Sequence, residues 1–532
     1  MINKRNLIQA ESYRKDIDGL RAIAVLAVIA FHFGFLPNGY LGVDVFFVIS
    51  GFLITNIIYN ESLEGKFSVK KFYLRRIRRI IPLVFFISIV AIVLGIFTMV
   101  PNSLENLAQS IIATNLFSNN ILQAIITRNY WDVVNEFKPM MHTWSLGIEE
   151  QYYLFYPFIF MFLISIKRVR WILPILIILT ILSAILFFMP YQPHVIFFYL
   201  PFRFFELSIG GIAAVLLKKR LVDIKFSYLF IVILVGLLLI NDAILPGSVS
   251  LCLTVIISCL IIVSANNDAV SSFMLKNKLL VWTGVISFSL YMWHQLALSY
   301  TRILFIHEFS FIQIIVLLGL IFGLSVFTYH FVEQPFRNKT KVGDKKLFAI
   351  LIPTFLIIMS SSFFIYSKAG VLKDVPELDI YKSNITRGMH AKYNHKIHAL
   401  NKDFETATKT KVLIFGDSFA RDWANVLLES KYADAIEISY ANDYNVMLSR
   451  LTSADVVFLA FSRLEMYKTT LPLPDKNDLP KIWYVGLKNF GIDNGVFYNY
   501  RGDGYYLQRT SMQSGFLENN ELLKQQLGGQ YI

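Results

Sequence analysis

Eleven long apolar stretches constrain this chain more than any other feature of its sequence. They lie near residues 20–36, 41–59, 80–100, 146–166, 171–189, 194–217, 226–241, 248–265, 284–304, 310–332 and 347–366. Each stretch is about long enough to cross a bilayer as a helix. The composition agrees, because 55% of the residues are hydrophobic and only 16% are charged. The sequence therefore predicts an α-helical polytopic membrane protein, with ten spans in one block and an eleventh that follows as a tether.

The positive charges gather in alternate loops between these stretches. A formal net charge of +13 would by itself be compatible with a nucleic-acid-binding protein. The basic residues instead lie on one side, as in loops 60–79 and 337–346, and the intervening loops hold few beyond Arg128, Lys138 and Arg302. This distribution follows the positive-inside rule. We therefore expect no nucleic-acid partner, a cytoplasmic N-terminus, and an extracytoplasmic location for everything after about residue 367.

Two ionisable side chains lie inside the first apolar stretch. Arg21 and His32 are eleven residues apart, almost three helical turns, so both project from one helix face. Their Cα atoms would lie roughly 16 Å apart. A charged group at membrane depth costs about 2.5–3.5 kcal/mol on insertion scales, so such groups usually face a cavity or take part in chemistry. The alternative is that Arg21 reaches the cytoplasmic headgroups and His32 is a packing residue.

Later stretches carry further ionisable side chains, which are candidate supporting residues. They are Asp44, Glu149, Glu150, Arg203, Glu206 and His294. Arg203 and Glu206 are spaced i, i+3 and are close enough to pair. A structural alternative applies here too, since a buried ion pair can serve to fix helix register and a lone histidine can be a hydrogen-bonded core residue.

Seven segments together resemble one known family. They are DGLRAIAVLAVIAFH, GVDVFFVISGFL, FYLRRIRRI, HTWSLGIEEQYYLFYP, PFRFFELSIG, ISFSLYMWHQ and FVEQPFR. In this order, over residues 1–340, they closely resemble the bacterial membrane acyltransferase-3 family. The resemblance implies transfer of an acyl group, usually acetyl, from a cytoplasmic acyl-CoA to an extracytoplasmic acceptor. It also implies that Arg21 and His32 are the essential pair, and a neutral imidazole can act as a general base or accept the acyl group itself.

The donor implied by this resemblance is acetyl-CoA, which carries several phosphate charges. Four arginines lie just cytoplasmic of the third stretch and are candidates to bind those phosphates, because guanidinium groups suit phosphate geometry. They are Arg75, Arg76, Arg78 and Arg79. The alternative is that they are ordinary positive-inside anchors. The expected partners are acyl-CoA, an extracytoplasmic or lipid-linked glycan acceptor and membrane lipid, and no metal is expected.

The sequence changes character after a polar linker. From Lys411, VLIFGDS predicts a buried strand and a turn, FARDWANVLLES the following helix, and DVVFLAF and KIWYVGL two further buried strands. FGDSF resembles the first block of the SGNH hydrolase fold. In that fold the serine, here Ser418, is the nucleophile and its own N–H helps to form the oxyanion hole.

The C-terminal region also departs from the SGNH pattern. That fold takes its histidine and aspartate from a C-terminal D-x-x-H block, and no histidine follows His398 in this chain. The only other nearby histidines are His390 and His395, in the linker before the first strand. We expect either that the domain is truncated or that it has lost its triad, so that Ser418 lacks a base.

These observations predict four regions: a membrane acyltransferase domain at 1–340, an eleventh transmembrane helix at 341–370, an extracytoplasmic linker at 371–410 and a partial α/β SGNH-like domain at 411–532. The predicted function is O-acylation of a surface glycan such as the O-antigen of lipopolysaccharide, at the bacterial cytoplasmic membrane. The closest alternative is a peptidoglycan O-acetyltransferase. An ion-coupled transporter also fits ionisable residues in many spans, and a catalytically inactive scaffold fits the missing histidine.

Overall fold

The computed structural model groups the chain into two compact units. It describes residues 13–126, 137–166, 171–218, 226–241, 243–265, 268–305, 309–374, 381–383, 396–462, 464–469, 481–487 and 515–532. The helical unit comprises Met1–Thr98, Asn106–Arg302 and Glu308–Phe364, and the C-terminal unit comprises Met99–Glu105, Ile303–His307 and Ile365–Ile532. His390 and His395 lie outside the described residues.

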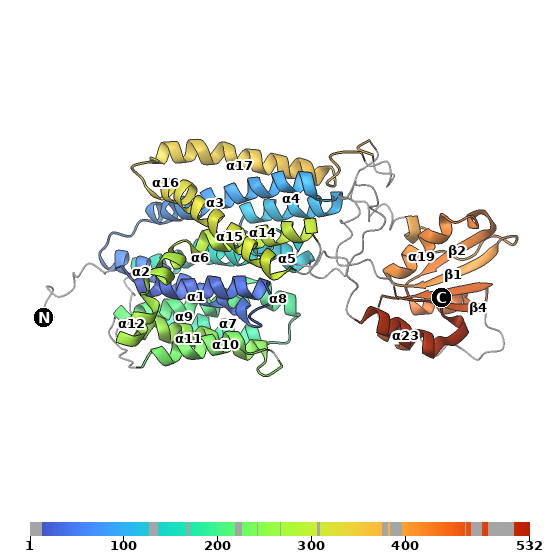
Figure 1. The fold of residues 1–532 in the computed structure, drawn as a ribbon, viewed down its shortest axis with the longest axis horizontal. Coiled ribbons are helices and arrows are strands. Elements are labelled where there is room, and N and C mark those ends of the chain that lie inside the picture. The colour runs from blue at the N-terminus through green and yellow to red at the C-terminus, as the bar shows by residue number, and fades with distance from the viewer. Residues whose placement is uncertain are drawn as a thin grey trace. The chain divides into compact units, whose positions relative to one another are not determined.

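The helical unit is built almost entirely of α-helices, and its long helices run roughly parallel to one another in Figure 1. The first half contains α1 (Lys15–His32), α2 (Gly42–Leu63), α3 (Val69–Thr98), α4 (Pro101–Asn115), α5 (Asn119–Ile126), α6 (Thr143–Ser165) and α7 (Ile172–Phe188). The second half contains α8 (Pro193–Phe198), α9 (Leu200–Lys218), α10 (Tyr228–Leu239), α11 (Gly247–Ser264), α12 (Ala269–Leu275), α13 (Lys278–Val285), α14 (Ser287–Phe305), α15 (Phe311–Thr328), α16 (Gln334–Arg337) and α17 (Asp344–Ser367). A π-helical turn, η5 (Tyr329–Glu333), joins α15 to α16.

Every predicted apolar stretch coincides with helix in this structure. Within the described ranges, six helical segments are both long enough and apolar enough to cross a membrane: Gly39–Leu63, Val69–Thr98, Pro193–Lys218, Gly247–Ser264, Phe311–Arg337 and Asp344–Ser367. This agrees with a polytopic membrane protein, while the count of eleven crossings stays a prediction. The predicted tether, α17, belongs to the helical unit for most of its length.

Close helix packing brings α2 and α9 together in the middle of the helical unit. A Cβ atom at Gly51 would lie 1.7 Å from the backbone oxygen of Leu207, and one at Gly210 would lie 1.9 Å from that of Val48. Only glycine allows such an approach without moving the backbone. Around this contact, buried side chains of α1, α2, α9 and α11 form one apolar cluster, which fixes the positions of the polar groups that α1, α2 and α9 carry.

The C-terminal unit contains a four-stranded parallel sheet in the order β2-β1-β3-β4. Its elements are β1 (Thr410–Gly416), α19 (Ser418–Leu428), β2 (Ile436–Ala441), α20 (Tyr444–Leu451), β3 (Val456–Ala460), α21 (Leu464–Thr469), β4 (Lys481–Val485) and α23 (Phe516–Leu527). Alternate residues of β1 enter two apolar clusters: Val412 and Ile414 pack with α19, and Leu413 and Phe415 share the opposite cluster with α20 and α23. The strands predicted at β1, β3 and β4 are therefore present, whereas β2 was not predicted.

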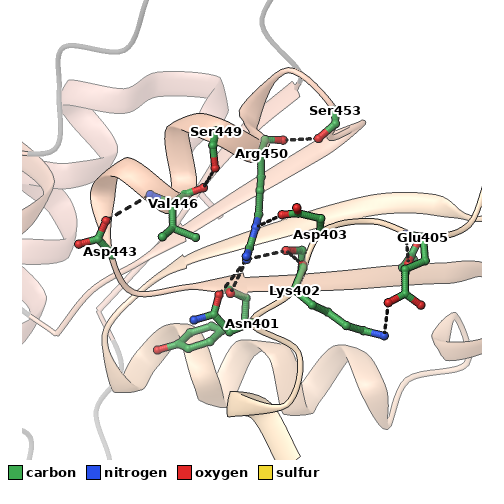
Figure 2. A network of polar contacts seen from close by, with 12 residues as sticks. Asn401, Lys402, Asp403, Glu405, Asp443, Val446, Ser449, Arg450 and Ser453 are labelled. Carbon is green, nitrogen blue, oxygen red and sulfur yellow. Dashed lines mark hydrogen bonds and ion pairs between the residues drawn. The ribbon is translucent and has the colours of Figure 1, made fainter.

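Polar contacts fasten the segment before β1 to β2 and α20, as Figure 2 shows. Arg450 of α20 donates from Nε to Asp403 Oδ1 at 2.7 Å and from Nη1 to Asn401 Oδ1 at 2.9 Å. The Ser439 hydroxyl of β2 donates to the backbone oxygen of Lys402 at 2.6 Å. The pKa of the Glu437 carboxyl lies below its ordinary value. The largest cause is the hydrogen bond from the Thr406 hydroxyl, and the backbone N–H groups of residues 405 and 406 add to it.

Candidate functional site

Two adjoining cavities open inside the helical unit and share a set of lining residues. The wider cavity, about 570 Å³, is strongly basic. Its charged lining residues are Arg14, Asp18, Arg21, Arg75, Arg76, Arg78, Arg79 and Arg337. The narrower cavity, about 80 Å³, continues from it between α2, α3, α6 and α14. Arg21, Arg76 and Arg79 line both cavities and therefore mark the passage from one to the other.

Most arginines around the wider cavity already have a carboxylate partner. Arg75 pairs with Glu61 at 2.9 Å, and Arg337 pairs with the buried Glu333 at 2.8 Å. Arg78 is buried, pairs with Asp344 at 2.7 Å, and donates to the backbone oxygens of residues 336 and 342. The Arg78 guanidinium therefore anchors the linker between α16 and α17, although it also borders the cavity.

Arg76 and Arg79 differ from these paired arginines. Neither forms an ion pair or a hydrogen bond with any residue in the part of the chain that the structure describes. The Arg76 guanidinium lies over the rings of Phe72 and Tyr153, at 5.9 and 5.5 Å from their centroids. Arg21 has only a long contact, 3.4 Å, with Asp18. Two unpaired guanidinium groups at the junction of the cavities form a site suited to an anion, because bidentate hydrogen bonding by arginine matches phosphate oxygens.

The walls of the narrower cavity combine apolar side chains with several polar ones beyond the shared arginines. Glu149 accepts a hydrogen bond from the Ser50 hydroxyl at 2.8 Å and contacts the Tyr153 hydroxyl at 3.3 Å. Glu150 does not line this cavity, and its buried Oε1 has no hydrogen-bond partner among the described residues. Ser145 and Tyr291 also line the cavity, and their hydroxyl groups are 2.7 Å apart.

Beyond Ser145 and Tyr291 lies a cluster of three histidines, His32, His142 and His294, which we call the histidine cluster. The ring of His294 has its centroid 5.2 Å from that of His32 and 5.5 Å from that of His142. Tyr291 joins the cluster to the cavity, because its ring lies 5.3 Å from that of His142 and its hydroxyl donates to the His142 backbone oxygen at 2.9 Å. The cavity thus extends from Arg76 and Arg79 to Tyr291, which contacts the cluster.

The three imidazoles differ in exposure and in hydrogen bonding. His32, the last residue of α1, is half-buried, whereas His142 and His294 are 4% and 0% exposed. The His142 ring interacts with the backbone of Pro139, and Nε2 of His294 has no hydrogen-bond partner among the described residues. Arg302 donates to the His32 backbone oxygen at 3.0 Å and thereby satisfies a carbonyl at the end of α1. His32 is therefore the most exposed residue of the cluster.

Asp44, Arg203 and Glu206 form a separate buried ion triad between α2 and α9. Arg203 Nη2 lies 2.5 Å from Asp44 Oδ1, and Arg203 Nε lies 2.7 Å from Glu206 Oε1. All three side chains are at most 2% exposed. The triad borders the narrower cavity only indirectly, through Phe47 beneath the Arg203 guanidinium. This geometry fits a role in fixing the register of α2 against α9, and the predicted Arg203–Glu206 pair is present.

Residues 14–330 match a protein family described as an acyltransferase domain. The chain belongs to this acyltransferase family. The match includes α1, the cavities except for Tyr13 and their α16 lining, and the whole histidine cluster.

Named relatives agree with that membership. The chain is 30% identical over 362 residues to the peptidoglycan O-acetyltransferase OatA of Listeria monocytogenes serovar 1/2a, covering 63% of this chain and 57% of the relative. It is 29% identical over 360 residues to the O-acetyltransferase OatA of Staphylococcus aureus, covering 62% of this chain and 58% of the relative. The chain thus spans somewhat more than half the length of the curated relatives it matches. No solved structure matches this chain.

Outside the acyltransferase domain, Ser418 occupies a turn that the structure defines well. Gly416 ends β1 with φ at 148°, where a Cβ atom would lie 1.9 Å from the Ala460 backbone oxygen, so glycine is required. Asp417 caps α19, since its Oδ1 accepts from the Phe419 N–H at 2.9 Å and its Oδ2 accepts from the Ser462 N–H at 2.8 Å. Ser418 is then the first residue of α19, at the carboxyl end of β1 and 6% exposed.

A base for Ser418 is not evident in the described part of the C-terminal unit. His398 is the one histidine of that unit within the described ranges, and its exposed ring packs 6.1 Å from the ring of Tyr440. The Tyr440 hydroxyl lies 3.4 Å from the Gly416 backbone oxygen. No contact joins His398 to Ser418 itself, so the role predicted for Ser418 stays a prediction.

Proposed function

We propose that this acyltransferase transfers an acetyl group from cytoplasmic acetyl-CoA to a hydroxyl group of a cell-wall glycan outside the cytoplasmic membrane. The observation that carries the proposal is the cavity that runs from Arg76 and Arg79, which have no ion-pair or hydrogen-bond partner among the described residues, to Tyr291 beside the histidine cluster. Guanidinium groups at one end and imidazoles near the other suit a donor that is held by its phosphates and reacts at its acyl end.

The donor would enter through the wider cavity. Its phosphates would bind Arg76 and Arg79, with Arg21 beside them, and the narrow cavity would take the thin arm that ends in the thioester. Four arginines were predicted to bind coenzyme A. Two of them, Arg75 and Arg78, pair with carboxylates of the protein, which favours structural roles for these two. The distribution of basic loops supports placing this entrance on the cytoplasmic side.

The acceptor would approach His32 from the opposite side. The imidazole removes the proton of a glycan hydroxyl as its oxygen attacks the thioester carbonyl, the carbon–sulfur bond breaks, and coenzyme A leaves as its thiol. A half-buried histidine at the end of α1 can serve an acceptor that never enters the cytoplasmic cavity. The name of the Listeria relative favours peptidoglycan as the acceptor over the O-antigen expected from the sequence.

The test uses the full chain in lipid nanodiscs with acetyl-CoA labelled in the acetyl group. Solubilised peptidoglycan fragments and lipid-linked O-antigen oligosaccharides are offered separately, and acetylated products are measured by mass spectrometry. We expect acetylated peptidoglycan fragments, and none with the His32→Ala variant. Acetylation of the O-antigen oligosaccharide alone would overturn the peptidoglycan assignment, and consumption of neither acceptor by a folded protein would overturn the acetyl transfer itself.

A further inference from the structure

Two hydroxyl groups lie at the end of the narrow cavity away from the arginines. Ser145, Glu149 and Tyr153 follow one another at four-residue intervals on α6, and all three line this cavity. The Arg76 guanidinium lies over the Tyr153 ring, 5.5 Å from its centroid. Ser145 is a little over two helical turns from Tyr153, about 12 Å along the helix axis. Its hydroxyl therefore lies at the far end of the cavity, 2.7 Å from the hydroxyl of Tyr291.

The proton of the Ser145 hydroxyl is available to a further acceptor in the cavity. The Tyr291 hydroxyl donates its single proton to the His142 backbone oxygen at 2.9 Å. Ser145 is then the donor of the pair, and it has two acceptors to choose from: the Tyr291 oxygen at 2.7 Å and the His142 backbone oxygen at 3.2 Å. When the Ser145 hydroxyl rotates toward a third oxygen, Tyr291 still satisfies the buried backbone oxygen, so this rotation avoids the cost of an unsatisfied polar group.

We propose that the Ser145 hydroxyl donates a hydrogen bond to the carbonyl oxygen of the bound thioester and stabilises the negative charge that develops there. This inference rests on the proposed acetyl transfer. As the acceptor oxygen bonds to the carbonyl carbon, one electron pair of the carbonyl bond moves onto its oxygen. The pair returns as the carbon–sulfur bond breaks and coenzyme A leaves. The acceptor's proton goes to His32, and Ser145 keeps its own proton throughout.

A fixed donor in a buried cavity stabilises such a charge more than water does. Ser145 is 6% exposed, and Tyr291 orients it through the contact between their hydroxyl groups. Tyr291 is therefore a positioning residue in this proposal, because its hydroxyl holds the His142 backbone oxygen and leaves Ser145 able to turn to the substrate.

Packing is the competing explanation, and a second serine supplies a matched comparison. Ser208 of α9 donates to the backbone oxygen three residues earlier at 3.2 Å, and its hydroxyl lies 2.7 Å from that of Thr180. Ser145 has the same two distances to its own partners. Both serines are buried, but Ser208 lines neither of the two cavities. A packing role predicts similar effects of alanine at both positions, whereas a role at the thioester predicts an effect at Ser145 alone.

The experiment uses the full chain in nanodiscs and the ketone analogue of acetyl-CoA, in which a methylene group replaces the thioester sulfur. The analogue binds but cannot transfer its acetyl group, and it is isotope-labelled at the carbonyl carbon for carbon NMR. A hydrogen bond to the carbonyl oxygen moves this resonance downfield. We expect the bound resonance to lie upfield of its wild-type position in Ser145→Ala and at the wild-type position in Ser208→Ala. With acetyl-CoA itself, Ser145→Ala should lower kcat roughly 100-fold or more and leave KM close to that of the wild type, as for loss of one oxyanion donor.

A second variant keeps the Ser145 hydroxyl in place. Tyr291→Phe removes the group that satisfies the His142 backbone oxygen, so this oxygen, 3.2 Å away, should hold the Ser145 proton instead. We expect the carbonyl resonance to move upfield in Tyr291→Phe as well, and the double variant to lose no more than either single one. A wild-type resonance in Tyr291→Phe would contradict the positioning role of Tyr291.

Two results would overturn the role of Ser145: an unchanged carbonyl resonance in Ser145→Ala, or an equal upfield move in Ser208→Ala. Binding of the analogue shows at the same time that a variant is folded at this site. Failure of the proposed function would be seen separately, because a wild type that transfers no acetyl group from acetyl-CoA overturns that function whatever position the carbonyl resonance has.

Discussion

The helical unit and the C-terminal unit treat their polar side chains in opposite ways. In the described part of the helical unit, Arg76 and Arg79 at the junction of the cavities and Nε2 of the buried His294 beyond it have no hydrogen-bond partner. In the C-terminal unit, Asp417 uses both carboxylate oxygens to hold the Ser418 turn, and Arg450 has partners on several sides. Unpaired groups in a buried site are available to a substrate, whereas satisfied groups hold a fold in place. The difference supports the proposal that the chemistry of the molecule takes place in the helical unit.

The largest expected effect concerns the buried triad. Replacing Arg203 by methionine removes the cation between Asp44 and Glu206 and leaves two buried carboxyl groups without it. Breaking a buried pair in this way costs about 3–5 kcal/mol. We expect Arg203→Met to lower the thermal unfolding midpoint strongly in detergent. The matched control is Arg450→Met, whose partner Asp403 is 84% exposed. Equal melting of Arg203→Met and the wild type would show that the triad does not hold α2 against α9.

A second prediction separates two neighbouring arginines of α3. Among the described residues Arg79 has no ion-pair or hydrogen-bond partner, whereas Arg78 is occupied by Asp344 and by backbone oxygens. We expect Arg79→Gln to raise the KM for acetyl-CoA roughly tenfold to hundredfold, since a charge-assisted hydrogen bond contributes about 1.5–3 kcal/mol.

Arg78→Gln is the control for this comparison. It should reduce the stability of the protein and leave the KM for acetyl-CoA close to that of the wild type. A KM that rises equally in both variants, or only in Arg78→Gln, would contradict the division of the arginines into donor-binding and structural members.

The smallest expected effect lies in the C-terminal unit. Arg450→Ala removes the contacts that fasten residues 401–403 to α20, and because the partner carboxylate is exposed, the loss should be about 1 kcal/mol. Hydrogen exchange of the full chain should become faster in this segment, with acetyl transfer unchanged. Unaltered hydrogen exchange would mean that Ser439 and the backbone alone hold the segment. Reduced acetyl transfer would contradict the contrast drawn between the two units.

The sequence predicted local patterns along one helix better than it predicted which residues contact one another in the folded protein. The apolar stretches, the Arg21–His32 spacing and the Arg203–Glu206 pair are local patterns, and periodicity along one helix is enough to find them. His142 was missed although it opens the HTWSLGIEE segment, because it lies in a turn before α6 and its meaning depends on α1 and α14. Contacts between helices that are far apart in sequence are decided by packing, which a single sequence does not display.

The four arginines of α3 illustrate the same limit. Their shared location in one basic segment predicted a shared role, and nothing in the sequence distinguishes Arg78 from Arg79. The distinction arises because the segment from α16 to the start of α17 folds back onto Arg78 and supplies the carboxylate of Asp344 and the carbonyl groups of Phe336 and Val342. In the C-terminal unit, by contrast, the GDS turn could be predicted because glycine, cap and helix follow one another along the chain.

The central claim is that acetyl leaves coenzyme A through the histidine cluster of the helical unit. It is tested most directly by measuring release of free thiol from acetyl-CoA, in the presence of glycan acceptor, by full-length His32→Ala and Ser418→Ala variants. We expect thiol release to fall by at least roughly 100-fold in His32→Ala, as for loss of a general base, and to stay at the wild-type rate in Ser418→Ala. Wild-type release from His32→Ala, or loss of release in Ser418→Ala, would contradict this account.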